Sequence, residues 1–141
     1  MKGQKNMTIK GLFFTTKNGA ADMQVNEYEG PAAIEKAVGG DVGAVYLSLD
    51  YIALFNQQAE KNLLAPSGVL IVPEDDEKTR YDIMAGDFFI CRIDDNEDVQ
   101  PLNDLDEQRL KQVTKRIDNG VTFNNKEVAA YFIDLVSLNK D

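Results

Sequence analysis

Hydrophobic and polar residues alternate or recur along this chain in patterns that predict its strands and helices. Residues 7–16 are rich in aromatic and β-branched side chains, which is typical of a β-strand. Asn18 and Gly19 both tolerate a positive φ, as a tight two-residue turn requires. Residues 22–28 alternate between apolar and polar, so we expect them to return beside the first strand as a β-hairpin.

A short helix is predicted after this hairpin. Pro31 suits the first turn of a helix, and the glycine pair at 39–40 supplies the left-handed residue that commonly ends one. The segments 42–48 and 51–56 are rich in apolar and β-branched residues and are separated by a short connection. We therefore expect two strands there.

Two further strands are predicted in the middle of the chain. Residues 57–66 indicate a turn and an apolar loop, because the segment ends at a proline, which prevents a regular helix. The segment 68–72 is a predicted strand, and 82–93 is predicted to be the last one. The apolar run Phe88 to Cys91 indicates burial on both faces, and Gly86 permits a β-bulge.

The C-terminal third changes to a helical spacing. Asn103 or Asp104 caps the first predicted helix, with an acid three residues after Asp104 as in a capping box, and an Asn-Gly pair at 119–120 ends it. A second helix is predicted to begin at Asn124 or Asn125. The apolar positions of the first helix are Leu105, Leu110, Val113 and Ile117. Those of the second are Val128, Tyr131, Phe132, Leu135 and Val136.

The order of these elements predicts the fold class. Strands come first and helices last, which favours an α+β fold with a mostly antiparallel sheet, one short early helix and two C-terminal helices. No linker or internal repeat interrupts the sequence, so we predict a single domain over residues 1–141. Residues 1–6 are expected to be a frayed end. No apolar run is long enough to cross a membrane.

The composition removes most kinds of catalytic and metal site. The chain has no histidine and one cysteine, Cys91, which excludes Ser-His-Asp sites, Cys-His sites and the standard structural zinc sites. Without an activating histidine, Cys91 is expected to be a buried, inert thiol. We therefore expect a non-enzymatic protein without metal or cofactor. Its setting is expected to be cytosolic, because a single cysteine allows no intramolecular disulfide and the start lacks the apolar segment of a signal peptide.

Nearly all of the negative charge comes from one quarter of the chain. Residues 74–107 hold thirteen acids and three bases, a net charge of −10, whereas the whole protein carries −9. Such a protein repels phosphates, so we expect no direct nucleic-acid binding, and a basic protein partner fits better. The acids that form two loops and a helix start are Glu74, Asp75, Asp76, Glu77, Asp94, Asp95, Glu97, Asp98, Asp104, Asp106 and Glu107.

These acids have two main interpretations. In the first, they are solvated loops that only raise solubility. In the second, they form a partner-binding face that imitates the phosphate spacing of a nucleic acid, which requires the two loops to lie at the same end of the sheet. A calcium site and a catalytic carboxylate pair are weaker alternatives. The run 94–98 lacks the EF-hand spacing, and nothing in the sequence places two acids across a cleft.

Several segments resemble a family of small uncharacterised domains common in phages, plasmids and integrated elements of bacteria. The resemblance covers about residues 25–118 and consists of glycine turns, strands and a helix start. Its pieces are Val38-Gly39-Gly40, 42–47, 50–56, Leu63-Leu64-Ala65-Pro66, 82–90 and Pro101-Leu102-Asn103-Asp104. Family patterns often have an asparagine near the Leu-Pro piece, whereas Ser67 follows the proline here. The resemblance implies a mobile-element setting and no particular chemistry.

Small size, absent catalytic chemistry, concentrated negative charge and this resemblance predict an accessory protein that binds and inhibits a host defence protein. The most concrete version is an anti-CRISPR-like inhibitor whose acidic face occupies the nucleic-acid channel of an RNA-guided nuclease. One alternative is a small-molecule or nucleotide-signal sponge, with Lys61, Arg80 and Arg92 as the mid-chain bases. Another is a regulatory adaptor that binds a host protein through the C-terminal helices. The sequence leaves the oligomeric state open.

Overall fold

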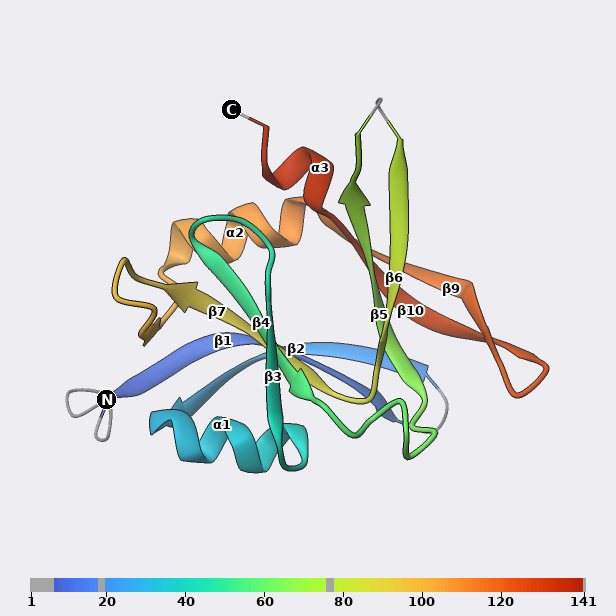
Figure 1. Cartoon of the computed structure of the whole chain (residues 1–141), viewed down its shortest axis with the longest axis horizontal. Coiled ribbons are helices and arrows are strands. Elements are labelled where there is room, and N and C mark those ends of the chain that lie inside the picture. The colour runs from blue at the N-terminus through green and yellow to red at the C-terminus, as the bar shows by residue number, and fades with distance from the viewer. Residues whose placement is uncertain (1–6, 18–19, 76–77, 141) are drawn as a thin grey trace.

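The computed structural model describes residues 7–17, 20–75 and 78–140, and its strands form two sheets (Figure 1). The predicted frayed end 1–6, the turn residues Asn18 and Gly19, and the candidate acids Asp76 and Glu77 lie outside the described residues. The elements, in chain order, are β1 (Thr8–Lys17), β2 (Ala20–Glu29), α1 (Gly30–Val38), β3 (Val42–Tyr46), β4 (Tyr51–Asn56), β5 (Pro66–Pro73), β6 (Thr79–Ala85), β7 (Phe88–Ile93), β8 (Val99–Gln100), α2 (Asp104–Gln112), β9 (Thr114–Phe123), β10 (Lys126–Asp134) and α3 (Leu135–Leu138).

The two sheets have different strand orders. Sheet A has the order β2-β1-β7-β4-β3, with β8 paired to β7, and its strand pairs are antiparallel. Sheet B has the order β6-β5-β10-β9, in which β5 and β10 are parallel and the other pairs are antiparallel. The prediction of a mostly antiparallel α+β fold is therefore confirmed. The predicted burial of Phe88 to Cys91 on both faces is also confirmed, since all four residues are fully buried in β7.

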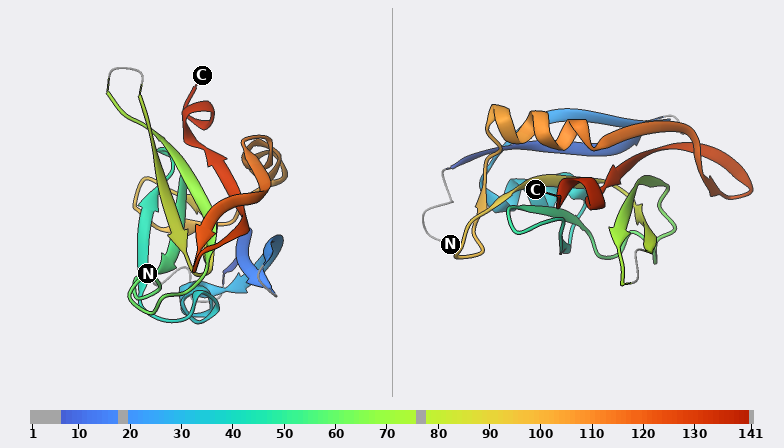
Figure 2. Two further views of the ribbon diagram at one scale, coloured as in Figure 1. Left: turned by 90° about the vertical axis from the view of Figure 1, so that its right-hand side faces the viewer. Right: turned by 90° about the horizontal axis from the view of Figure 1, so that it is seen from above.

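The main core lies between the sheets, and α1 covers the opposite face of sheet A (Figures 1 and 2). In the main core, the ring of Phe14 stacks on that of Phe88 with centroids 4.4 Å apart. On the other face, Ile34 and Val38 of α1 pack with Phe89. Fully burying a side chain of this size stabilises the fold by about 1.5–3 kcal/mol. The layers are thus α1, sheet A and sheet B.

The short early helix is confirmed, together with the way it ends. Pro31 lies in the first turn of α1, where its missing amide leaves no hydrogen bond unmade. Gly39 follows the helix with a φ of 101°, a left-handed conformation that glycine adopts without steric penalty. Its amide donates to the carbonyl oxygens of Glu35 and Lys36, which would otherwise lack partners.

The prediction of one last strand over 82–93 is wrong, because the chain turns at Gly86. This glycine has a φ of 72°, which L side chains rarely adopt, and it separates β6 of sheet B from β7 of sheet A. The buried hydroxyl of Ser67 donates a hydrogen bond to the carbonyl oxygen of Gly86. Gly86 is therefore the crossing between two sheets, where the sequence suggests a bulge within one strand.

The C-terminal third contains one helix of nine residues and one of four, where the sequence pattern predicts two longer helices. α2 ends at Gln112, and both Ile117 and the pair 119–120 lie inside β9. Asn124 and Asn125, the predicted start of the second helix, have φ angles of 52° and 65°. A type I′ hairpin turn needs positive φ at both central positions, so this pair closes the β9–β10 hairpin instead.

The second predicted helix is a strand because its apolar pattern also fits a strand buried on both faces. β10 lies inside sheet B, between β5 and β9. Tyr131 and Ile133 face the main core, whereas Ala130 and Phe132 pack on the outer side of the sheet. Apolar residues at consecutive positions also satisfy a helical spacing, so the pattern alone cannot distinguish the two. Backbone pairing with both neighbouring strands decides the outcome.

Candidate functional site

The structure separates the candidate acids into two groups. Glu74 and Asp75 lie at the tip of the β5–β6 hairpin in sheet B, whereas the loop 94–98 follows β7 in sheet A. Figure 1 shows the ends of β5 and β6 that border this connection at the top, and the 94–98 loop at the left. The expectation that both loops lie at one end of a sheet is wrong, because the crossing at Gly86 places them on different sheets.

The second group of acids shares one end of sheet A with the start of α2, and we call this region the acidic end. It consists of Asp94, Asp95, Glu97, Asp98, Asp104, Asp106 and Glu107. Asp50, which the sequence patterns do not single out, lies at the same end. Its carbonyl oxygen accepts a hydrogen bond from the amide of Ile93 at 2.9 Å, and the residue is exposed. Only its place in a short connection between two predicted strands hints at this position.

Asp94 builds the 94–98 loop with its side chain. Oδ1 accepts hydrogen bonds from the amides of Asn96 at 2.9 Å and Asp98 at 3.0 Å, and Oδ2 accepts one from Gln100 Nε2 at 2.9 Å. These bonds, above all that from the Asp98 amide, lower the pKa of Asp94 because they favour the charged carboxylate. Glu97 has a φ of 63°, a conformation that costs about 1–2 kcal/mol and that the rest of the loop enforces.

A further hydrogen bond ties this loop to sheet A. The hydroxyl of Tyr46 on β3 donates to Oε1 of Glu97 at 2.6 Å, and this bond raises the pKa of Tyr46. Asp95 and Asp98, by contrast, make no side-chain hydrogen bond or ion pair within the described residues. Asp95 is exposed and Asp98 partly so. These two carboxylates are therefore presented to solvent from a loop whose backbone is fixed.

The acids at the start of α2 stabilise the helix itself. The side chain of Asn103 accepts a hydrogen bond from the amide of Asp106, whose carboxylate accepts one from the amide of Asn103. The predicted capping box is thus present, with Asp106 in place of Glu107 as its acid. Asp106 also accepts a hydrogen bond at 2.7 Å from the hydroxyl of Tyr51, which is buried under the helix start.

Lys10 on β1 compensates part of the charge at the helix start. Its Nζ lies 3.3 Å from a carboxylate oxygen of Asp104 and 3.6 Å from one of Glu107. The hydrogen bond to Asp104 contributes most to raising the pKa of Lys10. Because solvent screens these ion pairs, they add little to the stability of the fold. The acidic end therefore has fewer uncompensated charges than the sequence suggests, and they are concentrated on the 94–98 loop.

Replacing Tyr51 by phenylalanine is expected to lower the free energy of unfolding by about 1–2 kcal/mol at pH 7, through loss of the bond to Asp106. Burial and this bond raise the pKa of Tyr51 to about 12, from about 10 when unfolded. Folding thus favours the neutral phenol. The contribution of this phenol to the free energy of unfolding is complete below pH 10 and is lost as the pH rises towards 12. The stabilities of the two proteins should therefore converge as the pH approaches 12. Urea unfolding at pH 7 and pH 11 measures this, and equal stabilities at pH 7 would contradict it.

Replacing Asp94 by asparagine is expected to destabilise the 94–98 loop at neutral pH. Because folding lowers the pKa of Asp94, its contribution is complete above the unfolded pKa of about 3.9 and is lost as the pH falls below it. The stability difference between the two proteins should therefore shrink between pH 5 and about pH 3. Thermal unfolding at both pH values checks this. An undiminished difference at pH 3 would mean that Asp94 does not act through its charge.

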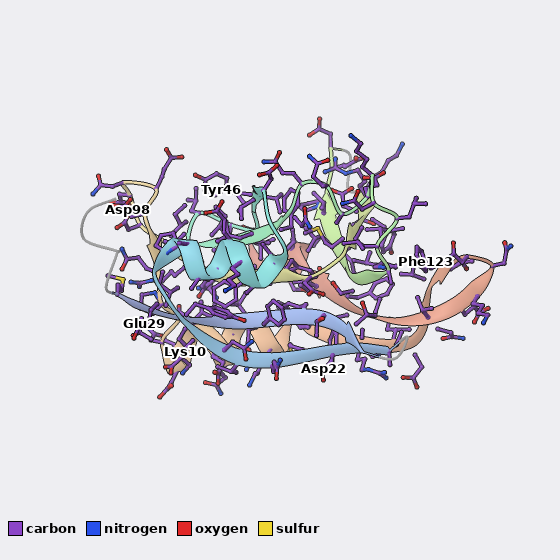
Figure 3. All side chains as sticks on the ribbon, turned by 90° about the horizontal axis from the view of Figure 1, so that it is seen from below. Lys10, Asp22, Glu29, Tyr46, Asp98 and Phe123 are labelled. Carbon is purple, nitrogen blue, oxygen red and sulfur yellow. The ribbon has the colours of Figure 1, made fainter. Side chains whose placement is uncertain are left out.

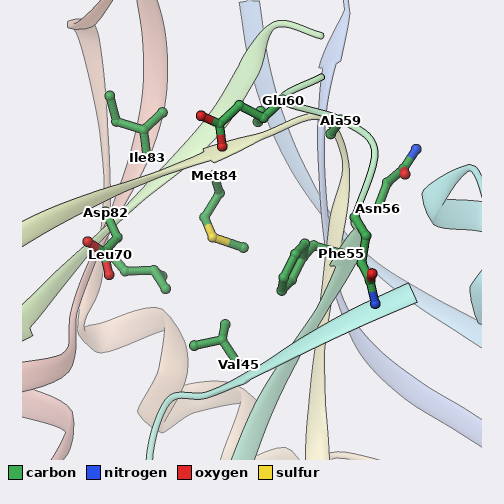
Figure 4. Close-up of a pocket in the computed structure, with 11 residues that line it drawn as sticks. Val45, Phe55, Asn56, Ala59, Glu60, Leu70, Asp82, Ile83 and Met84 are labelled. Carbon is green, nitrogen blue, oxygen red and sulfur yellow. The ribbon is translucent and has the colours of Figure 1, made fainter. Parts of the chain in front are cut away.

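A hollow of about 230 Å³ lies between the sheets beside β3 and β6 (Figure 4). Val45, Phe55 and Met84 line its interior, and Glu60 and Asp82 stand at its rim. Among the residues that the structure describes, no lysine or arginine lines this hollow, so it does not favour the phosphates of a nucleotide. The sequence gives no signal for it, because its residues come from four segments that only the fold brings together.

The remaining predictions about chemistry concern the cysteine, metals and membranes. Cys91 is buried as predicted, and burial raises the pKa of its thiol to about 12, which makes it unreactive near neutral pH. Among the residues that the structure describes, no group of three or more acids or cysteines is arranged to hold a metal ion. Over the same ranges, no helix has both the length and the apolar character needed to cross a bilayer.

A family model described as "Domain of unknown function (DUF3846)" matches residues 7–117 of this chain. The matched range includes sheet A, β5, β6 and α2, and it ends inside β9. No curated protein and no solved structure matches the chain. The match confirms the resemblance to an uncharacterised domain family and extends it from about residue 25 back to β1.

Proposed function

Because the chain belongs to this family of unknown function, we propose its function from the geometry of its own residues. The protein is a non-enzymatic inhibitor that binds a host defence protein through the acidic end. The surface it binds is basic and normally holds a nucleic acid, whose phosphates the carboxylates of the acidic end imitate. In this proposal the acids are the interface, and catalysis plays no part.

The preformed 94–98 loop supports this proposal most strongly. Three hydrogen bonds to the carboxylate of Asp94 and one from Tyr46 to Glu97 hold its backbone in place. Asp95 and Asp98 are thereby presented without the entropy cost that a flexible acidic loop pays on binding. A solvated loop that only raised solubility would gain nothing from the hydrogen bonds that fix its backbone. Glycine would also adopt the left-handed conformation of position 97 at a lower steric cost than Glu97 does.

The position of the other acids adds long-range attraction. Asp50 and the acids of α2 lie at the same end of sheet A, so their fields add to that of the loop. A basic groove approaching this end is steered towards it, which raises the association rate more than the final affinity. Since the Debye length is about 8 Å at physiological ionic strength, the attraction weakens with added salt.

The choice of partner rests on the resemblance to domains of phages and mobile elements. Such elements benefit from proteins that block host defences, and an RNA-guided nuclease offers a basic channel of the required kind. The protein then acts in the cytoplasm of the bacterial host, where that channel is formed. An anti-CRISPR-like inhibitor is the most specific form of the proposal.

The proposal is tested by mixing the purified protein with several RNA-guided nucleases before target DNA is added. We expect cleavage by at least one nuclease to fall as the protein is titrated in, and to fall more at low salt than at physiological salt. Cleavage that stays unchanged for every nuclease at both salt concentrations would rule out this form of the function.

The hollow of Figure 4 favours a second candidate, the binding of a small molecule. Its apolar interior and the carboxylates of Glu60 and Asp82 suit a small apolar cation better than a nucleotide signal. Mass spectrometry of the protein as purified, under native conditions, would reveal such a ligand by its added mass. The adaptor alternative now rests on α2, the first of its two predicted helices, because the segment predicted as the second helix forms most of β10.

A further inference from the structure

The outer face of sheet B, which points away from the main core, carries an apolar surface without a covering helix (Figure 2, left). One row of this face runs from Ile83 on β6 through Val69 and Phe132 to Lys115 on β9. The ring of Tyr81 meets that of Phe132 with centroids 6.5 Å apart. We call this surface the outer face. Its exposed and partly exposed apolar members are Ile71, Tyr81, Ile83, Ile117 and Phe132, with Leu63 and Leu64 at one edge, whereas Val69, Val121 and Ala130 are buried beneath them.

The outer face contains a ridge and a groove. Tyr81 and Ile83 are 61% and 60% exposed, and Leu63 beside them is 79% exposed, so large apolar side chains project from the β6 side. Three neighbouring hollows, the largest of about 570 Å³, share Tyr81, Phe132 or Val121 and form one groove towards β9 and β10. Exposed apolar surface of this extent marks an interaction site.

The charged residues at the borders of the groove that make no ion pair with another described residue have opposite signs on the β6 side and the β9 side. Four charged residues line its hollows, and two of these are already engaged. Asp82 pairs with Arg80 at 2.8 Å, and Asp134 caps α3. Glu60, on the β6 side, and Lys115, on the β9 side, make no ion pair within the described residues. The face therefore carries one free acid at one border and one free base at the other.

From this arrangement we infer that the outer face binds a second copy of the same chain. A two-fold axis parallel to the strands places β6 of one copy over β9 of the other. Residues that are paired side by side across the four strands form a row, and the axis sets each row of one copy opposite the same row of the other. Lys115 lies in the row of Ile83, and Glu60 lines the same hollow as Ile83. The rotation thus brings Lys115 of each copy to Glu60 of the other. It also sets the ridge of each copy against the groove side of its partner.

The overall charge of the protein is compatible with this pairing. The net charge of −9 would oppose most contacts between copies, but among the described residues the hollows of the outer face hold three acids and one base, and one of the acids, Asp82, is paired with Arg80. Figure 3 shows Asp98 of the acidic end and Phe123, beside the outer face, at opposite ends of the molecule. A dimer formed in this way leaves both acidic ends exposed, so the inference does not depend on the proposed function.

The size of the face indicates a weak dimer. Four strands span about 15–20 Å, and the apolar rows extend about 20 Å along them, which gives about 300–400 Å² per copy. A standard stable interface buries about 800 Å² per partner, so we expect a dissociation constant on the order of 100 micromolar. Sedimentation velocity of the full chain from about 1 to 500 μM covers that range. The expected result is a monomer that converts to a dimer with rising concentration.

The decisive variants alter exposed positions only. Ile83→Lys is expected to raise the dissociation constant at least about tenfold, because it places a charge in the apolar interface, opposite Lys115 of the second copy. Leu105→Lys, at a 71% exposed leucine on α2, is the matched control and should leave the constant unchanged. Circular dichroism establishes that both variants stay folded. A wild type that remains monomeric over the whole concentration range would overturn the inference, as would a dimer that Ile83→Lys leaves intact.

A charge exchange tests the two-fold geometry. Glu60→Lys and Lys115→Glu should each weaken the dimer by about threefold to tenfold, because each alone sets like charges against one another. The double variant restores opposite charges and should recover the affinity of the wild type to within about twofold. If the double variant is as weak as the single ones, the copies do not pair about this axis, and the inference fails.

Discussion

Replacement of Phe88 by alanine is expected to lower the free energy of unfolding by about 3–5 kcal/mol. Phe88 is fully buried in β7, and its ring stacks on Phe14 in sheet A. On its other side the ring packs on the backbone of β5, where a Cβ added at Gly68 would lie 2.7 Å from it. The ring thus fills the space between the sheets at a point where Gly68 of β5 has no side chain, so its removal leaves a cavity that cannot easily collapse.

Urea unfolding of the wild type and of Phe88→Ala measures this loss directly. Leu105→Ala is the control, because Leu105 is 71% exposed and its truncation should change stability by no more than about 0.5 kcal/mol. A loss below about 1 kcal/mol for Phe88→Ala would mean that the two sheets do not share this core.

The double charge reversal Asp95→Lys, Asp98→Lys is expected to weaken binding to the inhibited nuclease at least about tenfold, mostly through slower association. Both side chains lack partners within the described residues, so the fold should tolerate the change. The carboxylate of Asp94 accepts its bonds within the loop from the backbone amides of Asn96 and Asp98, and the substitutions retain both amides. Surface plasmon resonance gives both rate constants.

The matched control reverses two acids at the other charged site. Glu74→Lys, Asp75→Lys makes the same change in net charge at the tip of the β5–β6 hairpin, on the other sheet. We expect it to alter binding by less than about threefold, because long-range attraction is screened. Equal losses for the two variants would show that net charge alone matters, and the acidic end would then not be the interface.

The sequence predicts much of the first two thirds of the fold, because local signals mark its turns and strands, but it misses the break at Gly86 between β6 and β7. The hairpin over residues 7–28, the helix ended by Gly39 and the buried run Phe88 to Cys91 all correspond to elements of the structure. Each depends on residues that are close in the chain, such as a proline at a first turn or a glycine at a left-handed cap.

The C-terminal third was harder to predict because tertiary pairing overrides its helical spacing. Val128, Tyr131 and Phe132 fit a helix by spacing, yet pairing of β10 with both β5 and β9 makes the segment a strand. The informative local signal was the pair Asn124 and Asn125, whose side chains tolerate the positive φ of a type I′ turn. The same pair also resembles a helix cap, so only the partner strand distinguishes the two.

The acidic residues show a similar limit to what the sequence can predict about the candidate site. The sequence locates the charge correctly but cannot tell that Asp94 and Asp106 hold local structure while Asp95 and Asp98 remain available. The sequence also suggests that Glu74 belongs to the same surface as the 94–98 loop. It does so because the crossing between the sheets at Gly86 depends on contacts between residues that are distant in the chain. The neighbourhood of Asp50 and the outer face of sheet B arise in the same way and have no local signature.

The most direct test of the acidic end as a binding surface is the affinity for an RNA-guided nuclease, without DNA, as a function of salt concentration. Our account predicts binding at low salt that weakens steadily as salt is added, since screened charges supply the attraction. It also predicts that Asp95→Lys, Asp98→Lys removes most of this salt dependence, whereas Glu74→Lys, Asp75→Lys preserves it. An affinity that is independent of salt, or no binding at the lowest salt concentration, would contradict the account.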